Sequence, residues 1–335
     1  MKGSKIKTVI IGLGWITQGY EADAAGLFGM KFATHFSALR NHRRFTLSAA
    51  QDISTESRSR FKKGADECEM EIFIYSDWRE MVEREKPELV VVATNTESHA
   101  EICGGLIDMG VKNILCEKPI SYSVTEAESL VRKAEKKGCK LFINYFRAFN
   151  PSYIKLVENI KKDFLGKVQG FGVKYTKGVF NNGTHFFDLL VRMFGEIKSV
   201  KGLKNFATKV SEKDPTLSAA IEFKNGVSGF LHGMDNNFYN ILELDILGEL
   251  GRIRIVNEKA EFYLPKKSKS VKWYRALNLV PEKRLTNIKD GLRPVYDNIY
   301  SCLRLNGRNR CSGRDSLNSL RIAGEIVRPV RKHEK

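Results

Sequence analysis

The first part of the chain, up to residue 144, alternates short apolar runs with amphipathic segments. Apolar or β-branched runs predict strands at residues 5–11, 44–51, 72–75, 88–93, 113–116 and 140–144. Segments with helical spacing lie between them, near residues 32–39, 58–68, 77–85, 99–109 and 123–137. Because strand and helix alternate throughout, the expected fold class is α/β, with a doubly wound parallel sheet.

Beyond Tyr145 the pattern changes to strands that follow one another directly. Alternating residues predict strands at 167–176, 217–223, 227–234, 242–247, 252–256 and 260–264. Helices are expected at 153–161, 183–194, 291–305 and 312–328. This pattern is typical of a large, mostly antiparallel sheet with a few helices. A chain of 335 residues exceeds the usual size of one core, so we predict two domains, 1–146 and 147–335.

The first predicted strand runs directly into Gly12-Leu13-Gly14, the start of a dinucleotide-binding fingerprint. The first glycine of such a loop permits a tight turn, and the second lets the backbone approach a pyrophosphate. Thr17 stands where the fingerprint has its third glycine or an alanine, so the sequence departs from the pattern there. The residues of this loop that we expect to bind the cofactor are Gly12, Gly14, Trp15 and Ile16.

Asp52 ends the second predicted strand, the position from which an acid binds the adenosine ribose. It lies further from Gly14 than the usual spacing of about 20 residues, and we attribute the excess to an insertion over residues 20–30. No arginine follows Asp52 at once, so NAD is predicted, with NADP disfavoured. The alternative is a surface aspartate at a strand end.

An acid and a lysine follow the fifth predicted strand. Pro119 ends that strand because it has no N–H to donate, which puts Glu117 and Lys118 at the carboxyl edge, where open parallel sheets bind ligands. A lysine there can polarise a substrate oxygen, whereas the alternative is a charged turn. Cofactor contacts at this edge are expected from Thr94, Asn95, His99, Glu117 and Lys118.

A second polar stretch, residues 181–188, lies at the start of the expected helix 183–194, which interrupts the strands of the second predicted sheet. His185 and Asp188 are three residues apart and therefore share one helix face. A histidine at the start of a buried helix can share a substrate hydroxyl with a lysine, although a structural histidine is the alternative.

Taken together, the chain resembles the glucose–fructose oxidoreductase, inositol dehydrogenase and rhizopine-catabolism (Gfo/Idh/MocA) family. The resemblance spans residues 5–327 and rests on the order of Gly12-Leu13-Gly14, Glu117-Lys118-Pro119, the turn 144–151, and Gly183-x-His185-x-x-Asp188. It implies an N-terminal Rossmann domain and a C-terminal α/β domain with a large open sheet. That sheet is implied to form a homodimer or homotetramer.

The resemblance also implies hydride transfer between nicotinamide and a carbinol of a sugar, polyol or nucleotide sugar. Lys118 and His185 map onto the family's catalytic lysine and histidine. The residues expected to bind the substrate are Arg147, Asn181, Thr184, His185 and Asp188. Many members have an aspartate at the position of Asn181, and an asparagine cannot accept a proton. Two alternatives stay open: a non-catalytic nucleotide or sugar sensor on the same fold, and an NAD-dependent glycoside hydrolase.

The net charge and the cysteine content indicate which partners and which cellular compartment to expect. The formal net charge is +17, and residues 266–335 hold 18 Lys and Arg against 6 Asp and Glu. This basic region is either a solvated surface or a means of attracting anions. Without a nucleic-acid motif or a long apolar run, neither nucleic acid nor a membrane is an expected partner. Six scattered cysteines and no signal-peptide pattern favour a cytoplasmic protein without a metal site.

Overall fold

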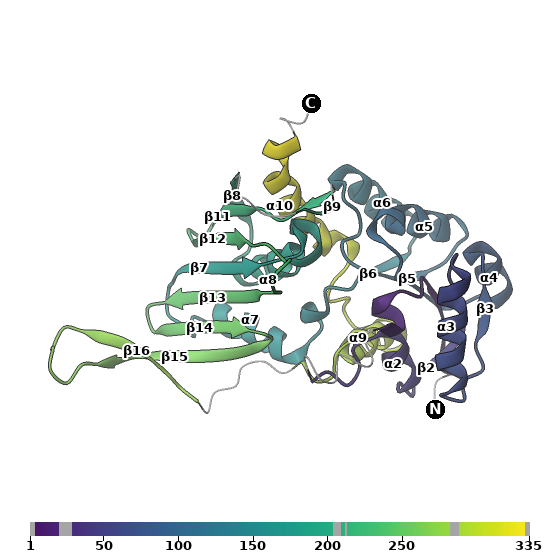
Figure 1. Cartoon of the computed structure of the whole chain (residues 1–335), viewed down its shortest axis with the longest axis horizontal. Coiled ribbons are helices and arrows are strands. Elements are labelled where there is room, and N and C mark those ends of the chain that lie inside the picture. Colours follow the sequence, from purple (N-terminus) through teal and green to yellow (C-terminus); the bar gives the residue numbers. More distant parts are fainter. Residues whose placement is uncertain (1–3, 20–28, 204–208, 212, 282–287, 332–335) are drawn as a thin grey trace. The chain divides into compact units, whose positions relative to one another are not determined.

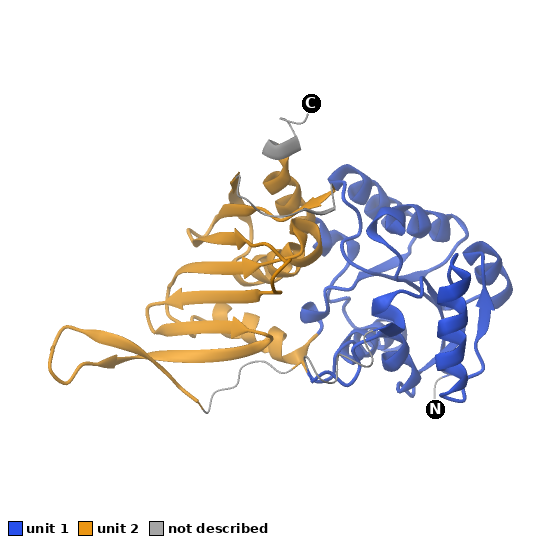
Figure 2. Ribbon diagram, in the orientation of Figure 1, with its two compact units in different colours: residues 1–149, 289–317 blue, residues 150–288, 318–335 orange. Residues whose placement is uncertain are grey.

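The structure is a computed structural model that describes residues 4–19, 29–203, 209–211, 213–281 and 288–331. The predicted insertion falls mostly on residues 20–28, which lie outside the described part. The chain forms two compact units, residues 1–149 with 289–317, and residues 150–288 with 318–335 (Figure 2). The predicted domain boundary after residue 146 differs from this division, because Lys289–Leu317 belongs to the first unit.

Unit 1 contains a six-stranded parallel sheet in the order β3-β2-β1-β4-β5-β6 (Figure 1). The strands are β1 (Ile6–Ile11), β2 (Phe45–Gln51), β3 (Phe73–Tyr75), β4 (Leu89–Val92), β5 (Asn113–Cys116) and β6 (Lys140–Ile143). All of β4 is buried, as its continuous apolar sequence predicts. The order reverses between β1 and β4, and in such sheets the ligand crevice lies outside the carboxyl ends of the strands at this point.

The helical segments of unit 1 connect these strands. They are η1 (Trp15–Gly19), α2 (His35–Arg40), α3 (Thr55–Asp66), α4 (Trp78–Glu85), α5 (Thr96–Asp108), α6 (Val124–Lys136), η2 (Phe146–Ala148) and α9 (Arg293–Arg304). The Ser123 hydroxyl accepts the Glu126 N–H and caps α6. The Glu126 carboxylate accepts from the Ser121 hydroxyl, so the cap is built from a neighbouring serine as well.

The segment Lys289–Leu317 returns to unit 1 through backbone hydrogen bonds. The Ile143 N–H donates to the Cys311 carbonyl at 2.9 Å, which continues the edge of the sheet beyond β6. The Leu292 N–H donates to the Phe32 carbonyl at 2.7 Å, just before α9. These long-range contacts explain the difference from the predicted boundary, since a change in local pattern cannot reveal a segment that returns to an earlier sheet.

Unit 2 contains an eight-stranded sheet in the order β16-β15-β14-β13-β7-β12-β11-β8, antiparallel except for the β7–β12 pair. Its strands are β7 (Val168–Tyr175), β8 (Ile197–Leu203), β11 (Ser218–Phe223), β12 (Ser228–Gly233), β13 (Leu242–Gly248), β14 (Gly251–Val256), β15 (Lys259–Lys267) and β16 (Arg275–Leu279). A two-stranded sheet joins β9 (Lys209–Ser211) and β10 (Asp214–Pro215). The remaining elements are α7 (Pro151–Lys161), η3 (Gly178–Gly183), α8 (Thr184–Phe194) and α10 (Gly313–Arg331), which begins in unit 1.

The two faces of the large sheet differ. Helix α8 covers one face, where Phe194 stacks on Phe171 of β7 and packs edge-on against Phe223 of β11. On the opposite face, side chains of the central strands β13 and β14 form ion pairs, including Arg252–Asp245 and Arg254–Glu243. The predicted fold class is therefore confirmed, and the pattern missed only the short or polar strands β8, β9, β10 and β16.

Candidate functional site

The glycine loop closes the carboxyl end of β1. Gly12 has a φ of +95°, and a Cβ there would stand 2.6 Å from the Ala93 carbonyl oxygen, so only glycine fits this position. Gly14 has no heavy atom within 4 Å of where its Cβ would stand. The loop therefore leaves backbone open at Gly14, as a surface that approaches a pyrophosphate requires.

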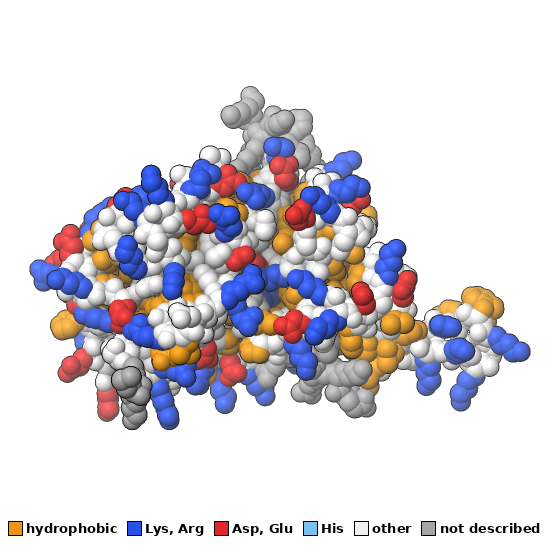
Figure 3. Space-filling model, turned by 180° about the vertical axis from the view of Figure 1, so that it is seen from behind, with side chains coloured by type: hydrophobic (Ala, Val, Ile, Leu, Met, Phe, Trp, Pro, Cys, Tyr) orange, Lys and Arg blue, Asp and Glu red, His pale blue; other side chains and the backbone are white. Residues whose placement is uncertain are grey.

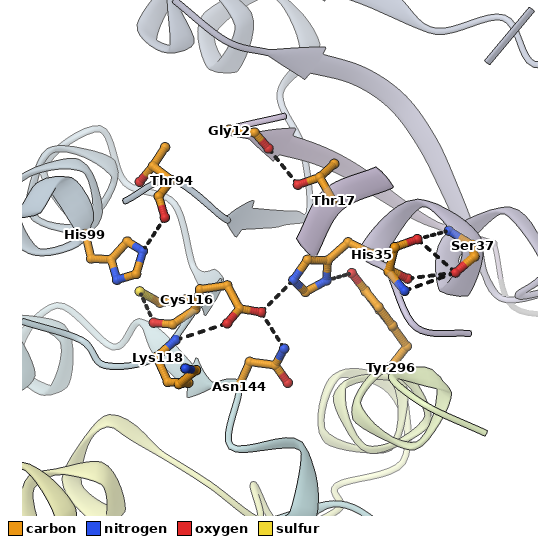
Figure 4. Close-up of polar contacts among 12 residues, drawn as sticks. Gly12, Thr17, His35, Ser37, Thr94, His99, Cys116, Lys118, Asn144 and Tyr296 are labelled. Atoms are coloured by element: carbon orange, nitrogen blue, oxygen red, sulfur yellow. Dashed lines mark hydrogen bonds and ion pairs between the residues drawn. The ribbon is translucent and has the colours of Figure 1, made fainter. Parts of the chain in front are cut away.

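Thr17 takes over part of the role of the missing third glycine. It is fully buried, and its hydroxyl donates to the Gly12 carbonyl oxygen at 2.7 Å (Figure 4). This bond ties η1 back to the start of the loop. Two predicted cofactor contacts follow Gly14: Trp15 is 66% exposed, whereas Ile16 is half-buried.

Asp52 lies beside this loop, as predicted. One carboxylate oxygen accepts the Leu13 N–H at 2.7 Å, and the other accepts the Ser54 N–H at 2.8 Å. Two cations lie close to this acid: Arg58, the nearest possible counter-cation by sequence, and Arg60. Arg58 donates to the Asp52 carbonyl oxygen at 2.7 Å, and Arg60 donates to the Leu13 carbonyl oxygen at 3.2 Å. A guanidinium group that reached the ribose would attract a 2′-phosphate, so both arginines can reduce the preference for NAD over NADP.

Glu117 is the buried centre of the site. One of its oxygens accepts from the Asn144 amide at 2.6 Å and from His35 Nε2 at 3.0 Å, and the other accepts the Lys118 N–H at 3.2 Å. Its side chain is 9% exposed, whereas Lys118 is half-buried. The Lys118–Pro119 peptide bond is cis. Glu117 therefore fixes the backbone that carries Lys118 at the carboxyl end of β5.

His35 extends this arrangement to α9 (Figure 4). Its Nδ1 lies 2.8 Å from the Tyr296 hydroxyl, and both side chains are fully buried. An ionised carboxylate only accepts hydrogen bonds, so Nε2 donates to Glu117. In the neutral imidazole Nδ1 is then the acceptor, and Tyr296 donates to it. We call Glu117, His35, Asn144 and Tyr296 the Glu117 clamp.

The clamp also sets the ionisation of its members. Desolvation by burial raises the pKa of Glu117, but the hydrogen bond from His35 and the charge that His35 carries when protonated, with the Asn144 hydrogen bond and the charge of Lys118, outweigh it and leave the pKa below its ordinary value. Burial, with a contribution from the Glu117 charge, raises the pKa of Tyr296 well above its ordinary value. Glu117 is therefore an anion and Tyr296 a hydroxyl donor across the physiological range.

His99 holds two loops together, where the sequence predicted a cofactor contact. It is 1% exposed, and its ring nitrogens lie 2.8 Å from the Pro119 carbonyl oxygen and 2.9 Å from the Thr94 carbonyl oxygen. Burial lowers its pKa and favours the neutral ring. A neutral ring has one N–H and donates to only one of these two carbonyls, although both nitrogens face backbone within the fold. Asn95, by contrast, is exposed at the start of α5 and forms no side-chain cap there, so it remains available to a ligand.

In unit 2 the stretch before α8 is held by a buried acid that the sequence analysis missed. Asp214 is 1% exposed and accepts the Phe180 N–H at 2.7 Å and the Asn181 N–H at 3.0 Å. Gly178 has a φ of +84°, and a Cβ there would stand 2.1 Å from an Asp214 oxygen. We call this arrangement the Asp214 loop. It carries Asn181 and leads into His185, which is half-buried in the first turn of α8.

Three other predicted substrate residues have partners inside the fold. Arg192 binds the Asp188 carboxylate with two hydrogen bonds, at 2.7 and 3.0 Å. The Thr184 hydroxyl donates to the Phe180 carbonyl oxygen at 2.6 Å. Arg147 is 6% exposed, and its guanidinium lies 4.6 Å from the Phe146 ring centre. These contacts stabilise the fold, and the substrate contacts of the three residues stay a prediction.

The structure thus groups the predicted residues by unit. Gly12, Asp52, Thr94, Asn95, Glu117 and Lys118 follow neighbouring strands at the carboxyl edge of the unit 1 sheet, and Asn181 and His185 lie at the start of α8 in unit 2. Within the described ranges, no three His, Cys, Asp or Glu side chains gather as metal ligands. In the same part of the chain, no helix is long and apolar enough to cross a membrane.

A parallel sheet in this order, with a glycine turn after β1 and an acid after β2, defines a dinucleotide-binding Rossmann domain. Residues 6–145 match the family model described as "Oxidoreductase family, NAD-binding Rossmann fold", and residues 171–334 match "Oxidoreductase family, C-terminal alpha/beta domain". The chain therefore belongs to the Gfo/Idh/MocA oxidoreductase family, which confirms the resemblance, and NAD is the cofactor of its Rossmann domain.

Curated relatives of this family include two inositol dehydrogenases. The myo-inositol 2-dehydrogenase of Thermotoga maritima is 23% identical over 200 residues, which cover 53% of this chain and 59% of the relative. The scyllo-inositol 2-dehydrogenase (NAD(+)) of Bacillus subtilis is 26% identical over 197 residues, with 52% and 57% covered. Each match therefore spans less than two thirds of the relative's own length.

Solved structures share the fold over nearly the whole chain. The WlbA dehydrogenase from Bordetella pertussis, in complex with NADH and UDP-GlcNAcA, has a TM-score of 0.77 at 20% identity, with 99% of this chain and 97% of that chain covered. A levoglucosan dehydrogenase, in complex with NADH and levoglucosan, has a TM-score of 0.74 at 16% identity, with 98% of each chain covered. At these identities the similarity shows the fold.

Proposed function

We propose that the protein is an NAD-dependent dehydrogenase that transfers a hydride between nicotinamide and a carbinol of a sugar, polyol or nucleotide sugar. The observation that carries this proposal is the Glu117 clamp, which fixes Lys118 at the carboxyl edge of a Rossmann sheet. Family membership supports the reaction class. The inositol dehydrogenases, and the complexes of levoglucosan dehydrogenase and WlbA, support the substrate class.

The residues of unit 1 fit a dinucleotide. Gly12 and Gly14 give the close backbone approach that a pyrophosphate needs, and Asp52 stands where ribose hydroxyls are bound. Among the described residues, the Asn144 amide oxygen is buried without a hydrogen-bond partner. A buried acceptor of this kind beside Lys118 is expected to receive a donor from a bound ligand. When bound, NAD supplies the hydride acceptor for oxidation, and NADH supplies the donor for the reverse reaction.

Lys118 is the residue proposed to act on the substrate. Its ammonium group donates to the carbinol oxygen and stabilises the negative charge that develops there as the proton leaves. Glu117 acts through Lys118, because it holds the Lys118 N–H and places a carboxylate beside the side chain. Glu117 is therefore a positioning residue in this proposal.

His185 is proposed to take the hydroxyl proton or to orient the sugar. A carboxylate does not assist it from position 181, because Asn181 cannot accept a proton. Asp214 does not replace that carboxylate, since both of its oxygens accept backbone N–H groups of the Asp214 loop. We therefore propose that Lys118 and His185 act without an aspartate relay.

We also propose a cytoplasmic protein that forms a homodimer or homotetramer through the eight-stranded sheet. All six cysteines are free, and five of them are buried, as expected for a reducing compartment.

For the oligomer, the face of the sheet that carries the Arg252–Asp245 and Arg254–Glu243 pairs is a suitable contact surface. Sedimentation of the purified chain would measure the oligomeric state directly.

The test is turnover by a Lys118→Ala variant on a panel of sugars, polyols and nucleotide sugars, followed by NADH absorbance. We expect loss of turnover with NAD affinity largely unchanged. Lys112→Ala is the matched control, because Lys112 is exposed just before the amino end of the same strand, β5. It should keep wild-type activity.

Three results would contradict the proposal in different ways. Hydride transfer at the wild-type rate in a single turnover of Lys118→Ala would remove the lysine from the mechanism. Tight NAD binding without turnover on any substrate would indicate a sensor. Hydrolysis of a glycoside without accumulation of NADH would indicate an NAD-dependent glycoside hydrolase.

A further inference from the structure

The edge of the unit 2 sheet ends in a two-stranded ribbon. Strand β15 pairs with β14 only over Lys259–Tyr263, whereas Tyr263–Lys267 pairs with β16. The outer half of the hairpin therefore has no third strand beside it and extends past the other strands of its sheet (Figure 1). An isolated two-stranded ribbon is marginally stable in water, so its side chains are expected to serve another contact.

The side chains of this ribbon, residues 264–281, are basic and apolar. The segment contains no Asp or Glu, and its five cations are Lys266, Lys267, Lys269, Lys272 and Arg275, all exposed. Trp273 is 83% exposed, Tyr274 51%, Leu279 49% and Leu277 43%. Figure 3 shows blue and orange side chains together on this projecting hairpin. We call residues 264–281 the basic ribbon.

We infer that the basic ribbon docks the protein on an anionic lipid surface. Lys and Arg side chains near such a surface are attracted by its negative potential. Trp and Tyr are favoured at the level of the lipid headgroups, where an apolar ring and a polar N–H or O–H are both accommodated. The ribbon presents both kinds of side chain, so it fits a surface that is charged outside and apolar within.

Other occupants account for fewer of these features. Phosphates of a nucleic acid would pair with the cations but leave Leu277 and Leu279 in contact with water. A second copy of the chain carries the same net charge of +17, and the oligomer contact proposed above uses the ion-paired face of the sheet, so the ribbon itself has little electrostatic attraction for a second copy. A surface contact of this kind needs no membrane-spanning helix, and it gives a function to five of the 18 cations of residues 266–335, which hydride transfer leaves unexplained.

The experiment is co-sedimentation of the full chain with vesicles of phosphatidylcholine alone or mixed with phosphatidylglycerol. We expect binding only to the anionic vesicles, weakened by added salt. Two variants remove the two contributions separately: Lys269→Glu with Lys272→Glu, and Trp273→Ser with Tyr274→Ser. In the Lys269→Glu, Lys272→Glu variant, the loss of two positive charges should by itself lower the partition coefficient roughly twenty-five-fold, at about fivefold for each. The two added negative charges should lower it further.

The matched control is Lys155→Glu with Lys201→Glu, which changes the net charge equally at exposed positions on α7 and β8. It should bind nearly as the wild type does. Equal binding to both vesicle types, no binding to either, or a control as weak as the ribbon variants would overturn the inference. The inference would also be overturned if the ribbon variants changed the oligomeric state, or lost binding to DNA, while the wild type did not bind lipid.

Discussion

Two buried acids, one in each unit, each hold a segment that carries or leads into a proposed catalytic residue. Glu117 in unit 1 accepts from two side chains and one backbone N–H, whereas Asp214 in unit 2 accepts the backbone N–H groups of Phe180 and Asn181. Side-chain donors come from distant segments, so the Glu117 clamp joins α2, β6 and α9 to Lys118. The Asp214 carboxylate fixes the backbone of the segment that leads into α8.

This difference predicts how each region fails. The Asp214 loop depends on close backbone approach, so added volume should disrupt it most. The Glu117 clamp depends on the match between donors and acceptors, so a change of one atom without a change of volume should disrupt it. Four substitutions test this contrast, and they are described in order of decreasing effect.

The largest effect is expected from Gly178→Ala in the Asp214 loop. The new Cβ would stand 2.1 Å from a buried carboxylate oxygen, at a φ of +84° that L-residues rarely adopt. We expect the free energy of unfolding to fall by about 3 kcal/mol or more, from overpacking and backbone strain together. Chemical denaturation would measure it.

Gly195→Ala separates strain from overpacking. Gly195 also has a φ of +84°, but no heavy atom lies within 4 Å of where its Cβ would stand. It should therefore cost only the strain of that backbone conformation, about 1–3 kcal/mol. If the two variants are equally destabilised, close approach to Asp214 is not what requires glycine at position 178.

Glu117→Gln changes one atom of the clamp and should be the next most severe. An amide oxygen facing His35 and Asn144 keeps their bonds but turns its NH₂ toward the Lys118 N–H, and the flipped amide opposes both side-chain donors. We expect a loss of about 2 kcal/mol of stability and a fall in kcat on the order of a hundredfold, because Lys118 is displaced. Steady-state kinetics would measure the fall.

The pH dependence of stability provides the control for Glu117→Gln. Because the folded-state pKa of Glu117 lies below its ordinary value of 4.5, the ionised group stabilises the fold above pH 4.5, and this contribution is lost as the pH falls through the folded-state pKa. The wild type should therefore lose stability in that acid window more steeply than Glu117→Gln. Parallel acid curves would show that Glu117 ionisation is not linked to folding.

These two regions also show which parts of the site are readable in a sequence. Gly12, Lys118 and His185 follow or begin strong local patterns, so the sequence predicts their elements well. The His35–Glu117 and His35–Tyr296 bonds join residues 82 and 261 positions apart, and no local pattern links such positions. Asp214 was missed for the same reason, because its strand has only two residues and its partners lie 33 and 34 positions earlier.

The fold was predicted better than the roles of individual side chains. Hydrophobic periodicity fixes strands such as β4 and β5, which are buried on both faces. Strands β8 and β16 were missed because polar and basic residues interrupt their apolar pattern. His99, Thr184 and Asp188 were predicted to contact ligands, and that stays a prediction. Their hydrogen bonds to neighbouring groups of the fold were not predicted, because such bonds depend on packing distances.

Asp52 extends the comparison to a third acid, with an intermediate effect. It holds backbone N–H groups as Asp214 does, but it is only half-buried beside the glycine loop. A 2′-phosphate there would meet a like charge, so we expect NAD to bind about tenfold more tightly than NADP, a difference of about 1.4 kcal/mol. Competitive titration with both cofactors would measure the ratio.

Asp52→Ala should abolish this discrimination, even though it also weakens both cofactors by freeing the Leu13 N–H. Arg58 and Arg60, which bind carbonyls of Asp52 and Leu13, would reduce the preference if they reached the phosphate. Equal affinities for both cofactors in the wild type, or an unchanged ratio in the variant, would show that Asp52 serves the loop alone.

The smallest effect is expected from Tyr296→Phe, at the far end of the Glu117 clamp. The substitution keeps the ring, which packs edge-on against Phe45 with ring centres 5.3 Å apart, and removes only the hydroxyl that donates to His35 Nδ1. A buried imidazole nitrogen then lacks its donor, which should cost about 1 kcal/mol of stability. Tyr300→Phe, one turn along α9 and beneath the Arg44 guanidinium, should change stability by less than about 0.5 kcal/mol.

A double-mutant cycle that combines Tyr296→Phe with Glu117→Gln decides whether the clamp acts as a unit, because side chains in one network give a non-zero coupling energy. Additive losses would show that Tyr296 and Glu117 stabilise unit 1 independently, and the clamp would then reduce to the bonds that Glu117 itself forms.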